Sequence, residues 1–554
     1  MTGREALAVA ALAILPIAPF ASAAFGIDEP VFLAVAHRIL AAPLDPFGFA
    51  MVWDSTGASE AARFNLNPPL LSYWLAPWLA AFGESETWLR VAVWPFALLA
   101  AFSFHAIASR AGVGALRATA LFLAAPAFVV LAATFQLDVA VGSWLLFAVS
   151  LLLRARASGA PRDELAAGCA AAAAGLTKYV GMAAIPLLGA GLVLLPGSRR
   201  PGLGSWLRAV GVPAAALALW GVYTRAQYGF VHYAAGLALV GGRGTSAAEL
   251  ASHAASLPIW YAGALAVPLL LFGWCLVRGR PRLELAVLAG IAGAGIALYV
   301  LPVGRPLRRV PLDLADGVLA ALCFGAGLWC VGLALARGLA ARSDPLDRFL
   351  ALWAGGFAAF SLFVNWHVNA ADALLIAPPL LLLWLRDPRL APSPRAQWSV
   401  AAASLALSLG LVAADAAQRN VYRTAASQLA AAIGDAPGTR WQVGQWGFQH
   451  YLARVGFRPL VPGSARSPGS PLAPGDWVAT ARNVSQLDVA AYMERFTLRP
   501  VDRFVAESRL PLRTTNPDAG AGFYTHHGGY VPFAISRVPL DEIALGRVIG
   551  APGD

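Results

Sequence analysis

Apolar segments of roughly 17 to 25 residues, separated by short polar stretches, recur along the first three quarters of the chain. As an α-helix, a segment of that length crosses the hydrocarbon core of a bilayer. The pattern predicts an all-α, polytopic membrane domain with about 13 transmembrane helices. The expected spans are residues 5–25, 88–109, 118–135, 139–154, 164–179, 182–196, 207–225, 257–277, 282–303, 313–337, 348–365, 371–385 and 397–415.

The apolar segment 68–82 differs from these, because it is short, begins with Pro68 and Pro69 and contains Pro77. If it lies flat on the outer interface, the arginine-rich loops all fall on one side of the membrane. That side is then the cytoplasm, because cytoplasmic loops carry an excess of basic residues. We therefore expect a cytoplasmic N-terminus, and interfacial helices on the outer face after the first span. The arginines gathered in the cytoplasm would be Arg4, Arg110, Arg117, Arg154, Arg156, Arg162, Arg199, Arg200, Arg208, Arg278, Arg280, Arg282, Arg337, Arg342, Arg348, Arg386, Arg389 and Arg395.

The last quarter of the chain has a different pattern, rich in Arg, Asp, Gly and Pro, with short apolar runs such as residues 477–480. Short apolar runs between turn residues favour strands. The sequence therefore predicts two domains. Residues 1–415 form the transmembrane domain, with an outer-face interfacial loop at about 26–87, and residues 416–554 form a small extracytoplasmic α/β domain.

Composition narrows the function classes. Of 554 residues, 58% are hydrophobic and only 13% are charged, which excludes a single soluble core, a secreted disulfide scaffold and a disordered chain. The net charge of +11 comes from short clusters between apolar segments, as expected of loops that face anionic lipid, so nucleic acid is not an expected partner. Cys169, Cys275, Cys323 and Cys330 lie within apolar segments without zinc-ligand spacing, and no metal site is predicted.

Three acidic residues fall where spans should reach the outer surface. Asp28 and Glu29 follow the first span directly, and Asp138 lies between two apolar segments. A carboxylate that is partly desolvated at this depth has a raised pKa and is a better base. The alternatives are an acidic pair that caps a helix in a solvated loop and, for Asp138, an N-cap of a helix beginning at Val139.

The chain has 41 lysine and arginine residues, and Lys178 is the only lysine among them. Its compact charge suits a phosphate in a confined site, although a lysine that snorkels from a helix end is the alternative. Arg305, Arg308 and Arg309 form a basic cluster on the outer side that either binds an anionic group or sets local topology. The histidines, His367 among them, show no ligand spacing.

Several motifs, taken together and in order, resemble the membrane glycosyltransferases of the GT-C class. They are Asp28-Glu-Pro, Leu44-Asp-Pro-Phe-Gly-Phe49, Asn67-Pro-Pro-Leu-Leu-Ser-Tyr-Trp74, Leu176-Thr-Lys-Tyr179 and Trp446-Gly-Phe-Gln-His-Tyr451. The resemblance is to the family 39 group, which includes protein O-mannosyltransferases and lipid A aminoarabinose transferases. It implies a GT-C fold and transfer of a sugar from a polyprenyl-phosphate donor to a lipid, glycan or protein acceptor, on the outer face of the cytoplasmic (inner) membrane.

The resemblance also implies residue roles. Asp28 is the catalytic carboxylate with Glu29 as the adjacent acid, Asp138 is the second acidic position, and Lys178 is the motif lysine. Related enzymes have an Arg-Tyr pair where this chain has Ala371-Asp372-Ala373, so any donor-binding role of that region is in doubt.

Reasoning from the chemistry leads to the same assignment. A phosphate leaving group needs a cation, here Lys178 with the cluster of Arg305, Arg308 and Arg309. The acceptor hydroxyl needs a base on the opposite side of the sugar, and Asp28 in that role implies inversion. No cofactor is predicted with certainty, and a divalent cation is left open. The rival interpretation is a transporter or flippase of lipid-linked sugars, although the paired broken helices in repeated halves that this class shows are not evident.

Overall fold

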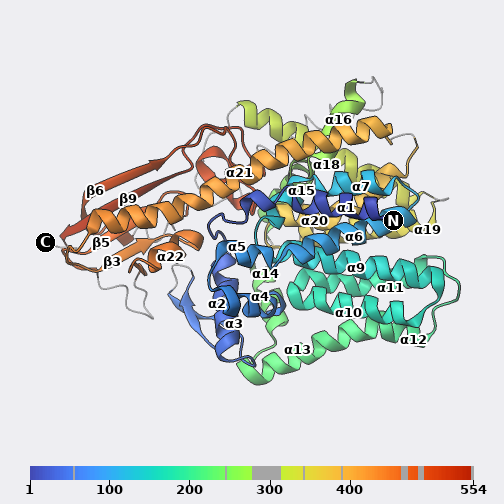
Figure 1. Ribbon diagram of the computed structural model, residues 1–554, viewed down its shortest axis with the longest axis horizontal. Coiled ribbons are helices and arrows are strands. Elements are labelled where there is room, and N and C mark those ends of the chain that lie inside the picture. The colour runs from blue at the N-terminus through green and yellow to red at the C-terminus, as the bar shows by residue number, and fades with distance from the viewer. Residues whose placement is uncertain are drawn as a thin grey trace.

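The computed structural model describes residues 1–53, 57–243, 246–277, 314–340, 343–388, 391–462, 472–484 and 492–550. Arg305, Arg308 and Arg309, and the expected span 282–303, lie outside these residues. The described chain is mainly helical, with a sheet near the C-terminus, and Figure 1 shows the two regions at opposite ends of an elongated molecule.

The helices of the first part of the chain are α1 (Gly3–Ile14), α2 (Glu29–Ala41), α3 (Ala61–Phe64), α4 (Leu70–Phe82), α5 (Glu86–Val91), α6 (Trp94–Arg110), α7 (Ala115–Leu123), α8 (Pro126–Ala132), α9 (Leu137–Ser158), α10 (Pro161–Thr177), α11 (Ala184–Leu194), α12 (Leu203–Trp206) and α13 (Val212–Tyr228). They are followed by α14 (His232–Arg243), α15 (Ala247–Leu265), α16 (Val267–Val277), α18 (Leu314–Leu339), α19 (Pro345–Phe363), α20 (Ala370–Leu385), α21 (Pro394–Ile433) and α22 (Trp446–Ala453). Short 3₁₀ or π segments lie at Ala18–Phe20, Tyr179–Ala183, Leu207–Gly211, Pro517–Ala519 and His526–Gly528.

Seven helical segments of the described chain are long and apolar enough to cross a membrane, which agrees with a polytopic membrane protein. They are Gly3–Phe20, Glu86–Arg110, Leu137–Ser158, Leu203–Tyr228, Leu314–Leu339, Pro345–Phe363 and Pro394–Ile433, and a bent pair makes up to eight. The expected spans 182–196 and 371–385 correspond to the apolar helical segments Tyr179–Leu194 and Ala370–Leu385, which are shorter than the seven long ones. The count of thirteen spans stays a prediction.

The bent pair is the expected span 118–135, which the structure divides into α7 and α8 with an angle of 64° between them. Pro126 opens α8, and Ala125 before it is extended, with φ −67° and ψ 138°. Proline lacks an N–H group and disfavours helical geometry at the preceding residue, and with Ala125 extended an unbroken helix was the wrong expectation here.

The segment 68–82 forms α4, which has 13 residues and packs against α2. At 1.5 Å per residue such a helix is about 20 Å long, which is less than the hydrocarbon thickness. Its length agrees with a helix that does not cross the bilayer, and its place on the outer interface stays a prediction. The hairpin of β1 (Ala50–Val52) and β2 (Ala58–Glu60) follows α2.

The C-terminal region contains a five-stranded mixed sheet with the strand order β4-β3-β5-β9-β6. Its strands are β3 (Arg440–Val443), β4 (Arg458–Pro459), β5 (Trp477–Ala481), β6 (Thr497–Ala506) and β9 (Asp541–Gly550), and a separate pair consists of β7 (Thr515–Asn516) and β8 (Ala521–Gly522). Strand β3 is parallel to β4 and β5, whereas β9 is antiparallel to β5 and β6.

Helix α21 joins the two regions and contains 40 residues without a break. The expected domain boundary at residue 415 therefore falls inside a helix. Figure 1 shows α21 running from the bundle of long helices to the sheet, and α22 packs against it. Because one helix belongs to both regions, the sheet has a fixed connection to the bundle.

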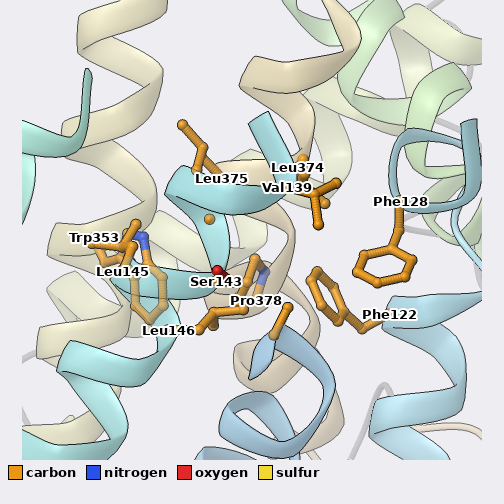
Figure 2. A pocket seen from close by; sticks show the side chains of 12 residues that line it. Phe122, Phe128, Val139, Ser143, Leu145, Leu146, Trp353, Leu374, Leu375 and Pro378 are labelled. Carbon is orange, nitrogen blue, oxygen red and sulfur yellow. The ribbon is translucent and has the colours of Figure 1, made fainter. Parts of the chain in front are cut away.

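The bundle core is closely packed. A small cavity of about 10 Å³ lies between α9, α20 and the bent pair, and Figure 2 shows that aromatic and aliphatic side chains surround it. The hydroxyl of Ser143 donates to the Ala140 carbonyl at 2.7 Å. A cavity this small and apolar has no means of catalysis, so the candidate site lies elsewhere.

Candidate active site

A larger cavity, with a volume of about 330 Å³ and both charged and apolar side chains in its wall, lies where α2, α9, α10 and α20 converge. Asp28, Asp138, Lys178 and Asp372 are the charged side chains among the described residues that line it. Three of these four were candidates from the sequence, although they are up to 150 positions apart in the chain (28 to 178). The fold therefore brings Asp28, Asp138 and Lys178 together, as the motif order implied.

Asp28 occupies the N-cap position of α2, yet its side chain makes no capping hydrogen bond within the described chain. Ile27, directly before it, has φ of 42°, which is strained for a β-branched residue. Strain of this kind persists only where the surroundings impose it, and it is common at functional sites. Burial raises the pKa of Asp28 to about 6, with a smaller opposing effect from Lys178 and a further upward one from Asp138. Such a carboxyl group is mostly ionised at neutral pH and still basic enough to accept a proton.

Glu29 does not reach the cavity, which corrects the expectation that it acts as a catalytic acid. Its side chain is fully buried and pairs with Arg90 at 3.0 Å. Its carboxylate also accepts the backbone N–H of Gly26 at 2.8 Å and that of Phe135 at 2.9 Å. Glu29 therefore connects the segment that precedes Asp28, through Gly26, with the segment that precedes Asp138, through Phe135. These contacts indicate a structural role.

Arg90 and Arg419 bind the backbone of the segment that precedes Asp28. Arg90 donates to the carbonyls of Ala21, Ala23 and Ala24, and Arg419 donates to the Ala24 carbonyl at 3.2 Å. Both arginines are almost fully buried. Their contacts explain how the short segment after the first span is kept in one conformation. This role could not be predicted from the sequence, because each arginine lies far from Asp28 in the chain.

Asp138 and Lys178 form an ion pair, with 2.6 Å between Oδ1 and Nζ. The N-cap of α9 is Gln136, so capping does not account for Asp138, which lies in the first helical turn. Lys178 follows the last residue of α10 in an extended conformation, and its side chain is 29% exposed. It points to a carboxylate in the cavity wall, which disagrees with a lysine that only snorkels.

Asp372 is the cavity residue that sequence reasoning missed, since its Ala-Asp-Ala context was noted only as a departure from related enzymes. Its carboxylate accepts from the Asn365 amide at 3.1 Å and from the Asn369 backbone N–H at 3.2 Å. It therefore organises the loop before α20, which forms one wall of the cavity. The capping sequence Asn-x-x-Asp at 369–372 was a signal that could have indicated it.

The C-terminal region also contributes to the cavity wall, through Phe523 and Tyr524. The Phe523 carbonyl accepts the backbone N–H of Ala370 at 3.0 Å, and the Tyr524 hydroxyl donates to Asp415 on α21 at 3.2 Å. Nothing in the short apolar runs of that region predicted such a contact. In the described part of the chain, no group of three or more His, Cys, Asp or Glu side chains is placed to hold a metal ion.

No family model and no curated protein matches the chain. Among solved structures, ArnT from Cupriavidus metallidurans in the apo state is 17% identical, with a TM-score of 0.43 over 90% of this chain and 95% of that one. The same protein bound to undecaprenyl phosphate has 17% identity and a TM-score of 0.42, with the same coverage. The oligosaccharyltransferase AglB from Archaeoglobus fulgidus, in complex with an inhibitory peptide and a dolichol-phosphate, is 14% identical, with a TM-score of 0.46 over 90% of this chain and 72% of that one.

These matched structures are GT-C glycosyltransferases. Because these similarities are low, the function of this chain has to be inferred from its own side chains.

Proposed function

We propose that this protein is an integral membrane glycosyltransferase that moves a sugar from a polyprenyl-phosphate donor to an acceptor. The acceptor is a lipid, glycan or protein on the outer face of the cytoplasmic membrane. The observation that carries the proposal is Asp28, a cavity carboxyl group with a pKa of about 6, next to the Asp138–Lys178 pair. A base and a cation in one cavity supply the two functions that transfer from a phosphate requires.

Asp28 acts as the general base. Its carboxylate removes the proton from the acceptor hydroxyl as that oxygen bonds to the anomeric carbon. The bond between the anomeric carbon and the phosphate oxygen breaks at the same time, and the phosphate departs with the electron pair. Attack opposite to the leaving group inverts the anomeric centre, and the proton stays on Asp28 until solvent removes it.

Lys178 stabilises the charge that develops on the leaving phosphate. An ammonium group has three N–H donors, so Lys178 keeps its bond to Asp138 and still donates to a phosphate oxygen. Asp138 then holds the ammonium group in position rather than touching the acceptor. Arg305, Arg308 and Arg309 stay a proposed part of the phosphate-binding region from their place in the sequence alone.

The competing function is movement of a lipid-linked sugar across the bilayer without chemistry. Transport needs a polar cavity but has no use for a base in a strained loop. Ile27 at φ 42° and the buried contacts of Glu29 and Arg90 constrain the backbone on either side of Asp28, which favours catalysis. A flippase would instead need this region to change conformation in each cycle.

The test is transfer by the purified protein in lipid nanodiscs, with radiolabelled polyprenyl-phosphate sugars as donors. Extracts of cell-envelope lipids, glycans and proteins serve as acceptors. We expect labelled product together with release of polyprenyl phosphate. Reconstitution into sealed liposomes distinguishes the transferase from a flippase, because a flippase moves the labelled donor between leaflets and leaves it intact.

A further inference from the structure

The loop between α19 and α20 contains a histidine that the catalytic scheme does not use. His367 lines the same cavity as Asp28 and Lys178, and Trp366 beside it also lines that cavity. The imidazole Nε2 atom lies 2.7 Å from the side-chain nitrogen of Asn369. This contact decides which ring nitrogen of His367 carries the proton.

The amide of Asn369 has only one orientation that satisfies its neighbours. Its oxygen accepts the backbone N–H of Asp372 at 3.0 Å, as the N-cap of α20. If the amide were turned over, two donors would face each other at that point. The amide nitrogen therefore faces His367, and because an amide nitrogen only donates, Nε2 of the ring must be the acceptor. The proton of the neutral imidazole is consequently on Nδ1.

The Nδ1–H group of His367 is buried and has no hydrogen-bond partner within the described residues. Burial lowers the pKa of His367 well below its ordinary value, and His527, Lys178 and His253 lower it further. The ring is therefore a neutral hydrogen-bond donor at physiological pH, not a base. Leaving a buried donor unpaired is unfavourable, and a bound acceptor atom would remove that cost.

We propose that His367 binds the sugar, donating its Nδ1–H to a hydroxyl oxygen of the substrate in the cavity. This inference rests on the proposed function and names the residue that recognises the sugar. A neutral donor suits a neutral hydroxyl, whereas Lys178 is the partner for phosphate. Trp366 supports the assignment, because its ring is 36% exposed and its centroid lies 4.0 Å from that of His367. An aromatic ring beside a fixed hydrogen-bond donor suits the apolar face and hydroxyl rim of a sugar.

Asn369 has a part in the same recognition, as a positioning residue that fixes the tautomer. Asn369→Asp keeps an oxygen that caps α20 but places an acceptor opposite Nε2, where the wild-type amide donates a hydrogen bond. Nε2 should then carry the proton and Nδ1 should lose it. The fold should be preserved in this variant, while the proposed donor to the sugar is removed.

The first experiment measures the tautomer directly, by ¹⁵N NMR of histidine-labelled protein in nanodiscs. The His367 signals are assigned by their loss in His367→Asn. We expect a protonated Nδ1 and an unprotonated Nε2 in the wild type, and the reverse in Asn369→Asp. A wild-type ring with its proton on Nε2 overturns the proposal, whether or not the protein transfers sugar.

The second experiment compares two substitutions that mimic one ring nitrogen each. An asparagine amide nitrogen occupies the place of Nδ1, and a glutamine amide nitrogen occupies that of Nε2. His367→Gln and Asn369→Asp should raise KM for the donor sugar about tenfold with a smaller change in kcat, while His367→Asn stays within about threefold of the wild type. Equal effects of Asn and Gln at this position overturn the assignment of Nδ1.

Binding of polyprenyl phosphate without a sugar tests whether His367 donates to a sugar hydroxyl oxygen or to a phosphate oxygen. Its affinity should be unchanged in His367→Gln, and an affinity reduced as much as that of the sugar donor overturns the assignment to a hydroxyl. Absence of transfer by the wild type with every donor would instead contradict the proposed function. Normal transfer with an unchanged KM in His367→Gln contradicts the further inference alone.

Discussion

Asp28 and Lys178 face one cavity, but their surroundings give them different roles. The carboxylate of Asp28 makes no capping hydrogen bond within the described chain, and its raised pKa suits proton transfer. Lys178 is held by Asp138 at 2.6 Å, which keeps its charge in a fixed position. The chemistry of each residue therefore follows from its neighbours rather than from its type.

Substitution of Lys178 tests the role of that charge. Removing a contact to developing negative charge typically costs about 2.7 to 4 kcal/mol, so Lys178→Ala should lower turnover by roughly two to three orders of magnitude with normal expression. Lys178→Arg keeps the charge but changes its shape, and it should be clearly impaired because a bulky planar guanidinium does not reproduce the compact charge of an ammonium group in a confined site. The measurement is the initial rate of sugar transfer. Full activity of the arginine variant would mean that Lys178 only carries a generic charge.

Glu29 fixes helix α2 against the N-terminus of helix α9. Its carboxylate pairs with Arg90 and accepts backbone N–H groups from Gly26 and Phe135, all within the protein interior. Because α2 begins at Glu29 and α9 begins at Leu137, these bonds set the distance between Asp28 and Asp138. Two helices separated by about a hundred residues are thus aligned by one side chain.

Glu29→Gln should therefore destabilise the protein. Removing one partner of a buried ion pair leaves an uncompensated charge and costs about 3 to 5 kcal/mol. Thermal unfolding in detergent should show a lower midpoint, together with reduced transfer. The matched control is Glu60→Gln, because Glu60 pairs with Arg63 on the surface, where both side chains are more than 60% exposed (68% and 66%), and such pairs contribute little. Equal midpoints for the two variants would contradict the structural role of Glu29.

Both the helical bundle and the C-terminal region contribute side chains to the wall of the cavity. Helix α21 passes from the bundle to the sheet, and Tyr524 from the C-terminal region lines the cavity and donates to Asp415 on that helix. The C-terminal region should therefore lie on the same side of the membrane as Asp28. The charge distribution predicts that this side is the outer one.

Labelling of single cysteines tests this topology. A cysteine in place of Glu507, an exposed residue after β6, should react with an impermeant thiol reagent added to intact spheroplasts. A cysteine in place of Ser198, exposed in an arginine-rich loop, should react only after lysis, and the unsubstituted protein gives the background of the native cysteines. Labelling of position 507 only after lysis would mean that the orientation is inverted.

The sequence predicted the helical class and three of the charged cavity residues, because both depend on local signals. Apolar length reveals a membrane helix, and Asp28, Asp138 and Lys178 stand out as charges at the ends of apolar segments. Glu29 was assigned wrongly, since adjacent carboxylates look equivalent until the fold buries one of them with Arg90. Asp372 and Tyr524 were missed for a related reason, as their place in the cavity depends on contacts between distant segments.

The most direct test of the central claim is the rate of sugar transfer as a function of pH for the wild type and Asp28→Asn. A base must be ionised to act, and the pKa of Asp28 is about 6. Wild-type turnover should therefore be constant above that pH and fall about tenfold per unit below it. Asp28→Asn should lose about a hundredfold or more at neutral pH and should lack this acidic limb. Near-normal transfer by Asp28→Asn, with the wild-type pH profile, would contradict the role of Asp28 as the catalytic base.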